Sequence, residues 1–135
     1  MQSRLKECEE QKKLIQYLRL KNLLYFAPMN ENQASFTNRK VAFLQEKKAK
    51  TMGKVKGVSD VIVILDDVVL FIELKRSPKK LKSGRLSVAD TKPSKEQLDF
   101  LDRVNKSKVC VGRVCYGADE AIKFVNENIK RCAKC

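Results

Sequence analysis

The sequence predicts an α/β domain whose mixed sheet is covered by helices on both faces, with elements in the order αβαββαβα. The stretch from residue 57 to residue 76, GVSDVIVILDDVVLFIELKR, is almost continuously apolar, as strands buried on both faces are. Segments with the apolar spacing of helices precede and follow this stretch. With 135 residues, 43% of them hydrophobic, we expect one domain over residues 1–135 that buries a core of its own.

Each element follows from a local pattern. Apolar residues at helical spacing, with starts near Thr37 and Ser94 that are plausible N-caps, predict helices at about residues 3–21, 37–52, 94–106 and 118–131. Short apolar runs bounded by turn residues predict strands at about residues 23–27, 58–65, 68–76 and 108–116. Residues 28–37 are expected to form a loop, and the polar, basic residues 77–92 a mobile loop.

The charge of the chain favours a polyanionic partner, with nucleic acid first. The sequence holds 29 Lys and Arg against 16 Asp and Glu, a net charge of +13. Residues 39–56 contain a single acid, Glu46, and residues 75–95 a single acid, Asp90. An anionic membrane surface fits less well, because neither block shows an apolar face with large aromatics. No apolar run is long enough to span a bilayer, and the charged N-terminus lacks an apolar signal core. We expect a cytoplasmic protein of bacterial or phage type, or one that is otherwise intracellular with DNA.

The chain has five cysteines and no histidine. Cys132 and Cys135 have the spacing of metal ligands, and Cys110 with Cys115 would be needed to complete a four-thiolate site. Residues five apart in a strand face opposite sides, which favours free thiols and no zinc site. Without histidine, a catalytic metal would be held by carboxylates and carbonyls, which points to Mg²⁺ or Mn²⁺.

Two acidic side chains are expected to meet in the central strand pair. A hairpin turning at Asp66-Asp67 places Asp60 directly opposite Glu73, with Cβ atoms about 4.5–5.5 Å apart. Lys75, two residues beyond Glu73, points to the same face. A two- or four-residue loop centred on this turn keeps the pairing, whereas a three- or five-residue loop breaks it.

Such a cluster indicates either a metal site or a simple ion pair. Two like charges in a partly buried place repel and lose hydration, so Lys75 and a divalent cation would both offset them. Two carboxylates and a strand carbonyl suit Mg²⁺, and the lysine can orient a water and stabilise a phosphate. The alternative is an ion pair on a solvated rim, formed by Asp60 or Glu73 with Lys75 or Arg76.

Two polar residues fall on predicted apolar helix faces. In the first helix Glu7 and Gln11 lie inside the apolar half, whereas Glu9 and Glu10 lie outside it, so Glu7 is the acid expected to face the protein. The apolar half is defined by Leu5, Cys8, Leu14, Ile15 and Leu18. A glutamate at the edge of the face, paired with a lysine, is the alternative. In the third helix Gln97 lies on the apolar face, but Ser94 and Gln97 also fit a capping box.

These residues together resemble a VRR-type nuclease domain, the virus-type replication–repair branch of the PD-(D/E)XK superfamily. The resemblance rests on Glu7 with Gln11, GVSD at 57–60, FIELK at 71–75 and SKEQ at 94–97. It covers nearly the whole chain in the same element order, and it implies a restriction-endonuclease-like core. Residues 77–92 are longer than expected at this place, which indicates a DNA-contacting arm or a disordered segment.

The resemblance also implies roles for individual residues. Asp60 and Glu73 would bind Mg²⁺ or Mn²⁺ with the Leu74 carbonyl as a third ligand, and Lys75 would be the catalytic lysine. Glu7 would assist at the metal, through a water, and Gln97 would orient Lys75 or a water.

A single-domain member of this kind would be a homodimeric DNA endonuclease that resolves four-way (Holliday) junctions. The alternatives are a flap- or sequence-specific endonuclease and an inactive DNA-binding protein of the same fold. No membrane partner is expected. The phosphate-binding residues would be Lys54, Lys56, Arg76, Lys79, Lys80, Lys82 and Arg85.

Overall fold

The computed structural model describes residues 4–28 and 39–133, with side chains described up to residue 130. Its elements are α1 (Glu7–Leu20), β1 (Leu24–Phe26), α2 (Arg39–Thr51), β2 (Val61–Ile64), β3 (Val69–Lys75), β4 (Lys79–Lys80), β5 (Leu86–Ser87), α3 (Lys95–Val104), β6 (Cys110–Tyr116) and α4 (Ala118–Ala133). The predicted cap at Thr37, the start at residue 3 and most of the loop at 28–37 lie outside the described residues.

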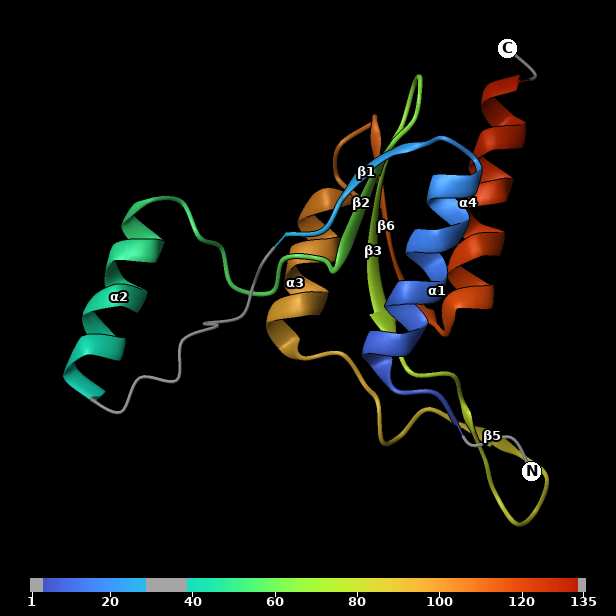
Figure 1. Cartoon of the computed structure of the whole chain (residues 1–135), viewed down its shortest axis with the longest axis horizontal. Helices are drawn as coiled ribbons and strands as arrows, with labels where there is room; N and C mark the ends of the chain where they lie inside the picture. The colour runs from blue at the N-terminus through green and yellow to red at the C-terminus, as the bar shows by residue number, and fades with distance from the viewer. Residues whose placement is uncertain (1–3, 29–38, 134–135) are drawn as a thin grey trace.

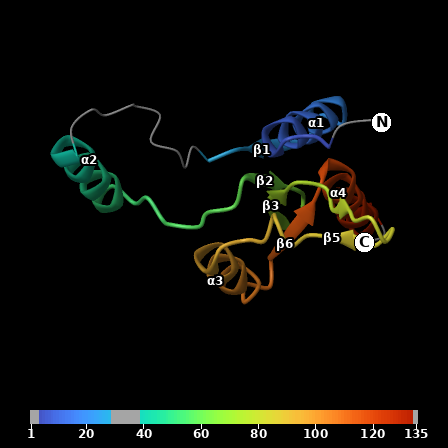
Figure 2. The same ribbon diagram turned by 90° about the horizontal axis from the view of Figure 1, so that it is seen from below.

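The main sheet is mixed, as the sequence predicts. Its strand order is β1-β2-β3-β6, with antiparallel pairs between β1, β2 and β3 and a parallel pair between β3 and β6. Helix α3 forms the crossover between the two parallel strands (Figure 1). Seen from below, α1 and α4 cover one face of the sheet and α3 covers part of the other (Figure 2).

The core lies between the sheet and the helices α1 and α4. Side chains that alternate along β2 and β3 point to this face, and none of them is accessible to solvent: Val61, Val63, Leu70, Ile72 and Leu74. They pack against Leu14, Leu18, Phe124 and Val125 of the two helices. The predicted apolar face of the strand pair is thereby confirmed.

The opposite face is covered by α3 only over β3 and β6. The rings of Phe71 and Phe100 meet edge to face with centroids 5.9 Å apart. A side chain on Gly112 would place its Cβ 2.8 Å from Leu101, so glycine lets α3 approach β6 closely. The neighbouring strands β1 and β2 leave Leu24 and Phe26 largely exposed on this face.

Residues 77–92 form a small hairpin rather than the expected mobile loop. Strands β4 and β5 pair antiparallel, and Gly84 adopts a positive φ of 84° in their turn. The guanidinium of Arg4 donates to both carboxylate oxygens of Asp90, at 2.5 and 3.1 Å, and to the Ser77 carbonyl at 2.7 Å. The loop prediction was wrong: the segment forms a short antiparallel pair, and Arg4, remote in the sequence, binds the residues Ser77 and Asp90 on either side of it.

Helix α2 stands away from the rest of the domain in both views (Figures 1 and 2). None of its residues is buried, and Phe43 and Leu44 are 69% and 63% exposed. The basic block at residues 39–56 therefore does expose large apolar side chains, contrary to the expectation from the sequence. In the described part of the chain, no helix has the length and apolar character needed to cross a membrane.

Candidate active site

The strand register brings Asp60 and Glu73 together. The observed pairs Val61 with Ile72 and Ile62 with Phe71 continue to Asp60 opposite Glu73. Asp60 lies just before β2, and its Oδ2 accepts a 2.8 Å hydrogen bond from the Leu74 amide. This bond extends the pairing past the end of β2, and the predicted register is confirmed.

The turn between β2 and β3 fixes this register. The Leu65 amide donates to the Val68 carbonyl at 2.9 Å, so Asp66 and Asp67 form the two-residue loop. A loop of this length is among those expected to keep Asp60 opposite Glu73.

Glu73 is a buried carboxylate that receives no hydrogen bond from an amide or hydroxyl group of the described residues. Its side chain is 1% exposed, and neither oxygen has a hydrogen-bond partner among the described residues. The Lys75 ammonium, itself nearly buried, lies 3.5 Å from Glu73 Oε1, which is an ion pair beyond hydrogen-bond range. The cluster is therefore inside the protein and not a solvated rim pair.

The electrostatics of the pair favour an added positive charge. Burial, followed by the charge of Asp60, raises the pKa of Glu73 to about 8, although Lys75 acts in the opposite direction. Burial also raises the pKa of Asp60, against the hydrogen bond from the Leu74 amide. Both carboxyl groups resist ionisation together because they share one poorly solvated place, and a cation bound between them would relieve this repulsion.

Glu7 lies at the edge of this cluster, at the first residue of α1. It is half-buried, and burial is the main cause that raises its pKa. Lys75, Asp60 and Arg76 also influence that pKa, which places Glu7 within electrostatic reach of all three. Among the described residues, no three His, Cys, Asp or Glu side chains form a metal site by themselves. The structure thus gives a carboxylate pair, with Glu7 outside direct ligand distance.

Gln97 performs the capping role that was the alternative prediction for it. Its Oε1 accepts from the Ser94 amide at 2.8 Å, and its own amide donates to Ser94 Oγ at 3.2 Å. Gly57 touches this first turn of α3: an added Cβ would come within 2.4 Å of the Glu96 carbonyl, and its φ is +83°. Glycine is required there on both counts, and it holds the segment before Asp60 against the start of α3.

A second buried glutamate, Glu10, was not predicted from the sequence. Glu10 is 4% exposed. Its Oε1 accepts a 2.9 Å hydrogen bond from Ser77 Oγ, and its Oε2 accepts from the Ala118 amide at the start of α4. The prediction that Glu10 faces away from the protein was wrong. The spacing Glu10, Leu14, Leu18, four residues apart on one helical row, was the signal that could have identified it.

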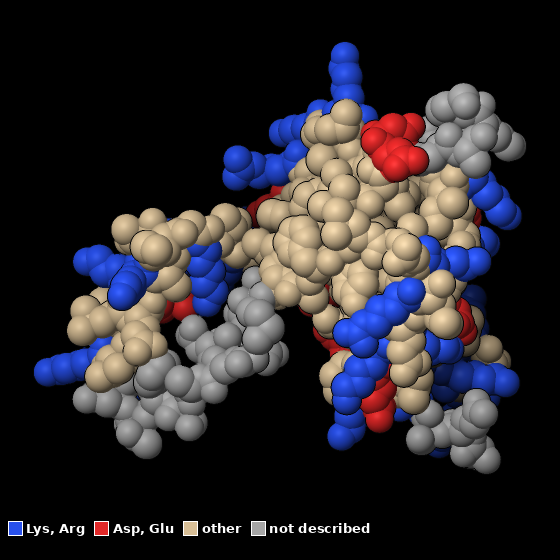
Figure 3. All heavy atoms as spheres, turned by 45° about the horizontal axis from the view of Figure 1, so that its top comes forward, with Lys and Arg blue, Asp and Glu red and all other residues tan. Residues whose placement is uncertain are grey.

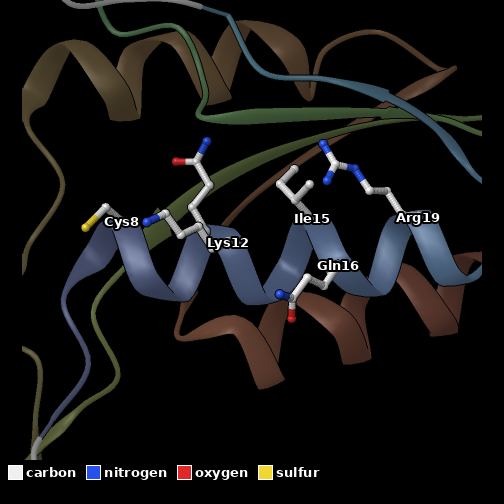
Figure 4. Close-up of a pocket in the computed structure, with 6 residues that line it drawn as sticks. Cys8, Lys12, Ile15, Gln16 and Arg19 are labelled. Atoms are coloured by element: carbon white, nitrogen blue, oxygen red, sulfur yellow. The ribbon is translucent and has the colours of Figure 1, made fainter.

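The depression on α1 is separate from the cluster. It has a volume of about 450 Å³, and the described residues that line it all belong to α1: Cys8, Gln11, Lys12, Ile15, Gln16 and Arg19. Figure 4 shows Cys8, Lys12, Ile15 and Arg19 on the same flank of the helix. Gln11, part of the motif with Glu7, lines this depression and is partly buried.

The predicted phosphate-binding residues lie in different surroundings. Lys54 forms a 2.9 Å ion pair with Glu46, and Lys56 is exposed. Arg76 donates to the main-chain carbonyls of Leu5 and Arg4, at 3.0 and 3.3 Å, so part of its guanidinium is engaged within the protein. The remaining four are exposed on the β4–β5 hairpin: Lys79, Lys80, Lys82 and Arg85.

The cysteines show no assembled thiolate site in the described part of the chain. Cys8, Cys110 and Cys115 are free thiols. Cys115 is buried, and burial raises its pKa to about 12, whereas Cys110 is only partly covered at the start of the same strand. The side chains of Cys132 and Cys135 lie outside the described residues.

Comparison with known proteins supports the fold. No family model and no curated protein matches the sequence. A solved structure described as a "VRR_NUC domain protein" superposes with a TM-score of 0.60 and 18% sequence identity, and the match covers 96% of this chain and 92% of that chain. The chain therefore has the fold of a VRR-NUC domain, over almost its full described length.

Proposed function

We propose that this protein is a Mg²⁺- or Mn²⁺-dependent endonuclease that hydrolyses DNA phosphodiesters at branched substrates, four-way junctions foremost. The observation that carries the proposal is the buried Glu73, which lies next to Asp60 and Lys75. Neither of its oxygens receives a hydrogen bond from an amide or hydroxyl group of the described residues. The fold shared with a VRR_NUC domain protein supports the interpretation of that cluster as a nuclease site.

The residues present fit a hard divalent cation. Orphaned carboxylate oxygens in a buried place require a positive partner, and oxygen donors are those that Mg²⁺ and Mn²⁺ prefer. Asp60 and Glu73 would bind the ion with the Leu74 carbonyl, and Glu7 would contact it through a water. When bound, such an ion acidifies a water and polarises a phosphoryl oxygen.

The chain supplies the remaining groups. Lys75, held against Glu73 at 3.5 Å, would orient the attacking water and stabilise charge on the phosphate. Gln97 is anchored by its capping bonds, and its proposed part is to orient Lys75 or a water. Glu73 and Asp60 would position the cation, because the strand pairing fixes their backbones.

The distribution of positive charge supports a nucleic-acid substrate. The end of the sheet that carries Asp60 and Lys75 lies between α2 and the β4–β5 hairpin (Figure 1), and both flanking segments are basic. Lys54, Lys56 and the four hairpin residues would contact phosphates, which positions DNA without reading its sequence. A two-fold dimer would present one such site to each of two strands.

A cleavage assay tests the function. The protein is incubated with a labelled four-way junction, a flap and a linear duplex, in Mg²⁺ or in EDTA. Metal-dependent cuts in branched DNA are expected, and they should disappear in Asp60→Ala and Lys75→Ala variants that still bind DNA. Asp66→Asn, which removes an exposed turn carboxylate, is the matched control and should cut normally.

The other outcomes identify the alternatives. Cleavage of the flap alone or discrete cuts in the linear duplex would indicate a flap- or sequence-specific nuclease. Binding without cleavage in any metal would indicate an inactive DNA-binding protein. Alanine at Lys79, Lys80 and Lys82 should lower the log–log salt dependence of binding by about 0.9 for every phosphate that the protein no longer neutralises, and an unchanged slope would remove the hairpin from the interface.

A further inference from the structure

Helix α2 exposes apolar side chains that nothing in the described chain covers. Val41, Phe43 and Leu44 are each more than a third exposed, and Met52 directly after the helix is 79% exposed. Helical spacing places them on one half of the helix surface, with Lys47 and Lys48 between them. Figure 3 shows this lobe, at its left, with basic and uncharged side chains and a small acidic area.

The sheet carries a matching uncovered surface. Leu24 and Phe26 of β1 pair with Ile64 and Ile62 of β2, so the four side chains share the face on which α3 packs. Ile62 is buried, with 6% of its surface exposed, whereas Leu24 is 65%, Phe26 49% and Ile64 39% exposed, so the uncovered part of this face consists of these three side chains. Apolar faces of sheets are normally covered by another element, and here that element is missing from the described chain.

We infer that α2 of one chain packs on the β1–β2 face of a second copy, and that the second copy returns the same contact. A two-fold axis makes both contacts identical and closes the assembly as a dimer. The inference rests on the two-chain assembly proposed above and not on cleavage. It adds the surface through which the two chains would associate.

Two observations favour a second copy of the chain as the partner: the charges at the edge of the contact, and the fact that a second copy would cover both exposed surfaces. Helix α2 carries Arg39, Lys40, Lys47, Lys48 and Lys50, and the turn that ends the uncovered face carries Asp66 and Asp67. Opposite charges at the rim of an apolar contact favour this pairing. A lipid surface or DNA would cover α2 but leave the β1–β2 face exposed, whereas a second copy covers both.

The experiment compares three double variants of the full chain by light scattering over a range of concentrations. Phe43→Ser with Leu44→Ser alters the helix, and Leu24→Ser with Phe26→Ser alters the sheet face. The control, Leu81→Ser with Leu86→Ser, removes two exposed apolar side chains of the hairpin region. We expect twice the 15.5 kDa chain mass for the wild type and the control, and a dimer dissociation constant raised about 100-fold or more in the other two.

Mixing the helix variant with the sheet variant tests the exchange itself. In a mixed dimer one contact joins an intact helix to an intact face, whereas in each variant alone both contacts are damaged. Mixing should therefore restore association, with one copy of each variant per dimer. Circular dichroism spectra of both variants that match the wild type show that the chains remain folded.

Several results would overturn the inference. A monomeric wild type would mean that α2 folds onto its own chain or serves another partner, and loss of binding to anionic vesicles in the helix variant would then identify a lipid surface. A dimer that resists both variants lies elsewhere on the molecule. If both variants are monomeric and do not associate when mixed, the helix does not pack on the sheet face of the second copy. The dimer would then be formed by contacts of helix with helix and of sheet face with sheet face.

Discussion

The two buried glutamates, Glu10 and Glu73, occupy neighbouring parts of the same domain in opposite ways. Glu10 accepts hydrogen bonds at both oxygens, from Ser77 and from the first amide of α4. Glu73 has no hydrogen bond at either oxygen among the described residues and lies opposite a second carboxylate. One group is satisfied by the protein, and the other is not.

The difference separates a structural acid from a candidate ligand. A helix N-terminus favours a negative charge, so Glu10 ties α1, the end of β3 and α4 together with no added group. A buried carboxylate that lies opposite a second carboxylate and has a single ammonium, that of Lys75, to offset it is costly, and a fold keeps one only where something else completes it. Burial alone thus says little about function, whereas the partners of each oxygen say much.

The largest expected effect is on cleavage. Glu73→Gln keeps the shape of the side chain but removes its charge, so cleavage of the best branched substrate should fall by about 100- to 1000-fold. The fall is measured as a single-turnover rate in Mg²⁺. Because the substitution also removes repulsion with Asp60, the unfolding free energy in EDTA should stay equal or rise.

Glu10→Gln is the matched control for that experiment. It should change the cleavage rate less than tenfold, because Glu10 contacts Ser77 and α4 and not the carboxylate pair. Equal losses of cleavage in the two variants would abolish the distinction between the two glutamates.

The second effect is on stability, and here substitution of Glu10 should have the larger effect and substitution of Glu73 the smaller one. Glu10→Ala removes charge-assisted hydrogen bonds to Ser77 and to the α4 amide, and it should lower the free energy of unfolding by about 3 kcal/mol. Urea denaturation in EDTA, followed by circular dichroism, measures this loss. Glu73→Ala should cost less, because the ion pair with Lys75 that it removes is offset by relief of the repulsion from Asp60; a larger cost at Glu73 than at Glu10 would contradict the comparison.

The sequence predicts one of these two sites and not the other, for a physical reason. Strand alternation and one turn place Asp60, Glu73 and Lys75 on a common face, and all the needed residues lie within one hairpin. The helical projection that missed Glu10 took Leu5 and Cys8 as apolar markers, yet both are exposed. Including these two residues rotated the centre of the predicted apolar face away from the buried row of Glu10, Leu14 and Leu18.

Contacts between remote segments were also beyond local patterns. Arg4 binds Asp90, 86 residues further along the chain, and the fit of Gly57 against α3 depends on packing between distant segments. The position of α2 could not be predicted, because its helical pattern is clear but its apolar face has no partner within the described chain.

The third effect is a dependence of stability on pH. The pKa of Glu73 is raised from its ordinary value near 4.5 to about 8 in the folded protein, so the folded state holds a proton that the unfolded state releases. The unfolding free energy in EDTA should therefore fall as pH rises from about 5 to 8, on the order of 2 kcal/mol. Glu73→Gln should lack most of this slope, and identical slopes in both proteins would remove Glu73 as its source.

The smallest effect is stabilisation by the cation itself. A ligand that binds only the folded state at ten times its dissociation constant adds about 1.4 kcal/mol, which corresponds to a rise of about 4 °C in Tm for a chain of this size. Titration with Mg²⁺ or Mn²⁺ should produce this rise in the wild type and in Glu10→Gln, whose carboxylate pair is intact. Glu73→Gln and Asp60→Asn should show little or none, because the oxygen pair that the cation requires is no longer charged at both positions. An equal rise in all four proteins would mean that the cation binds elsewhere, and Glu73 would then be a buried acid completed by something other than a metal.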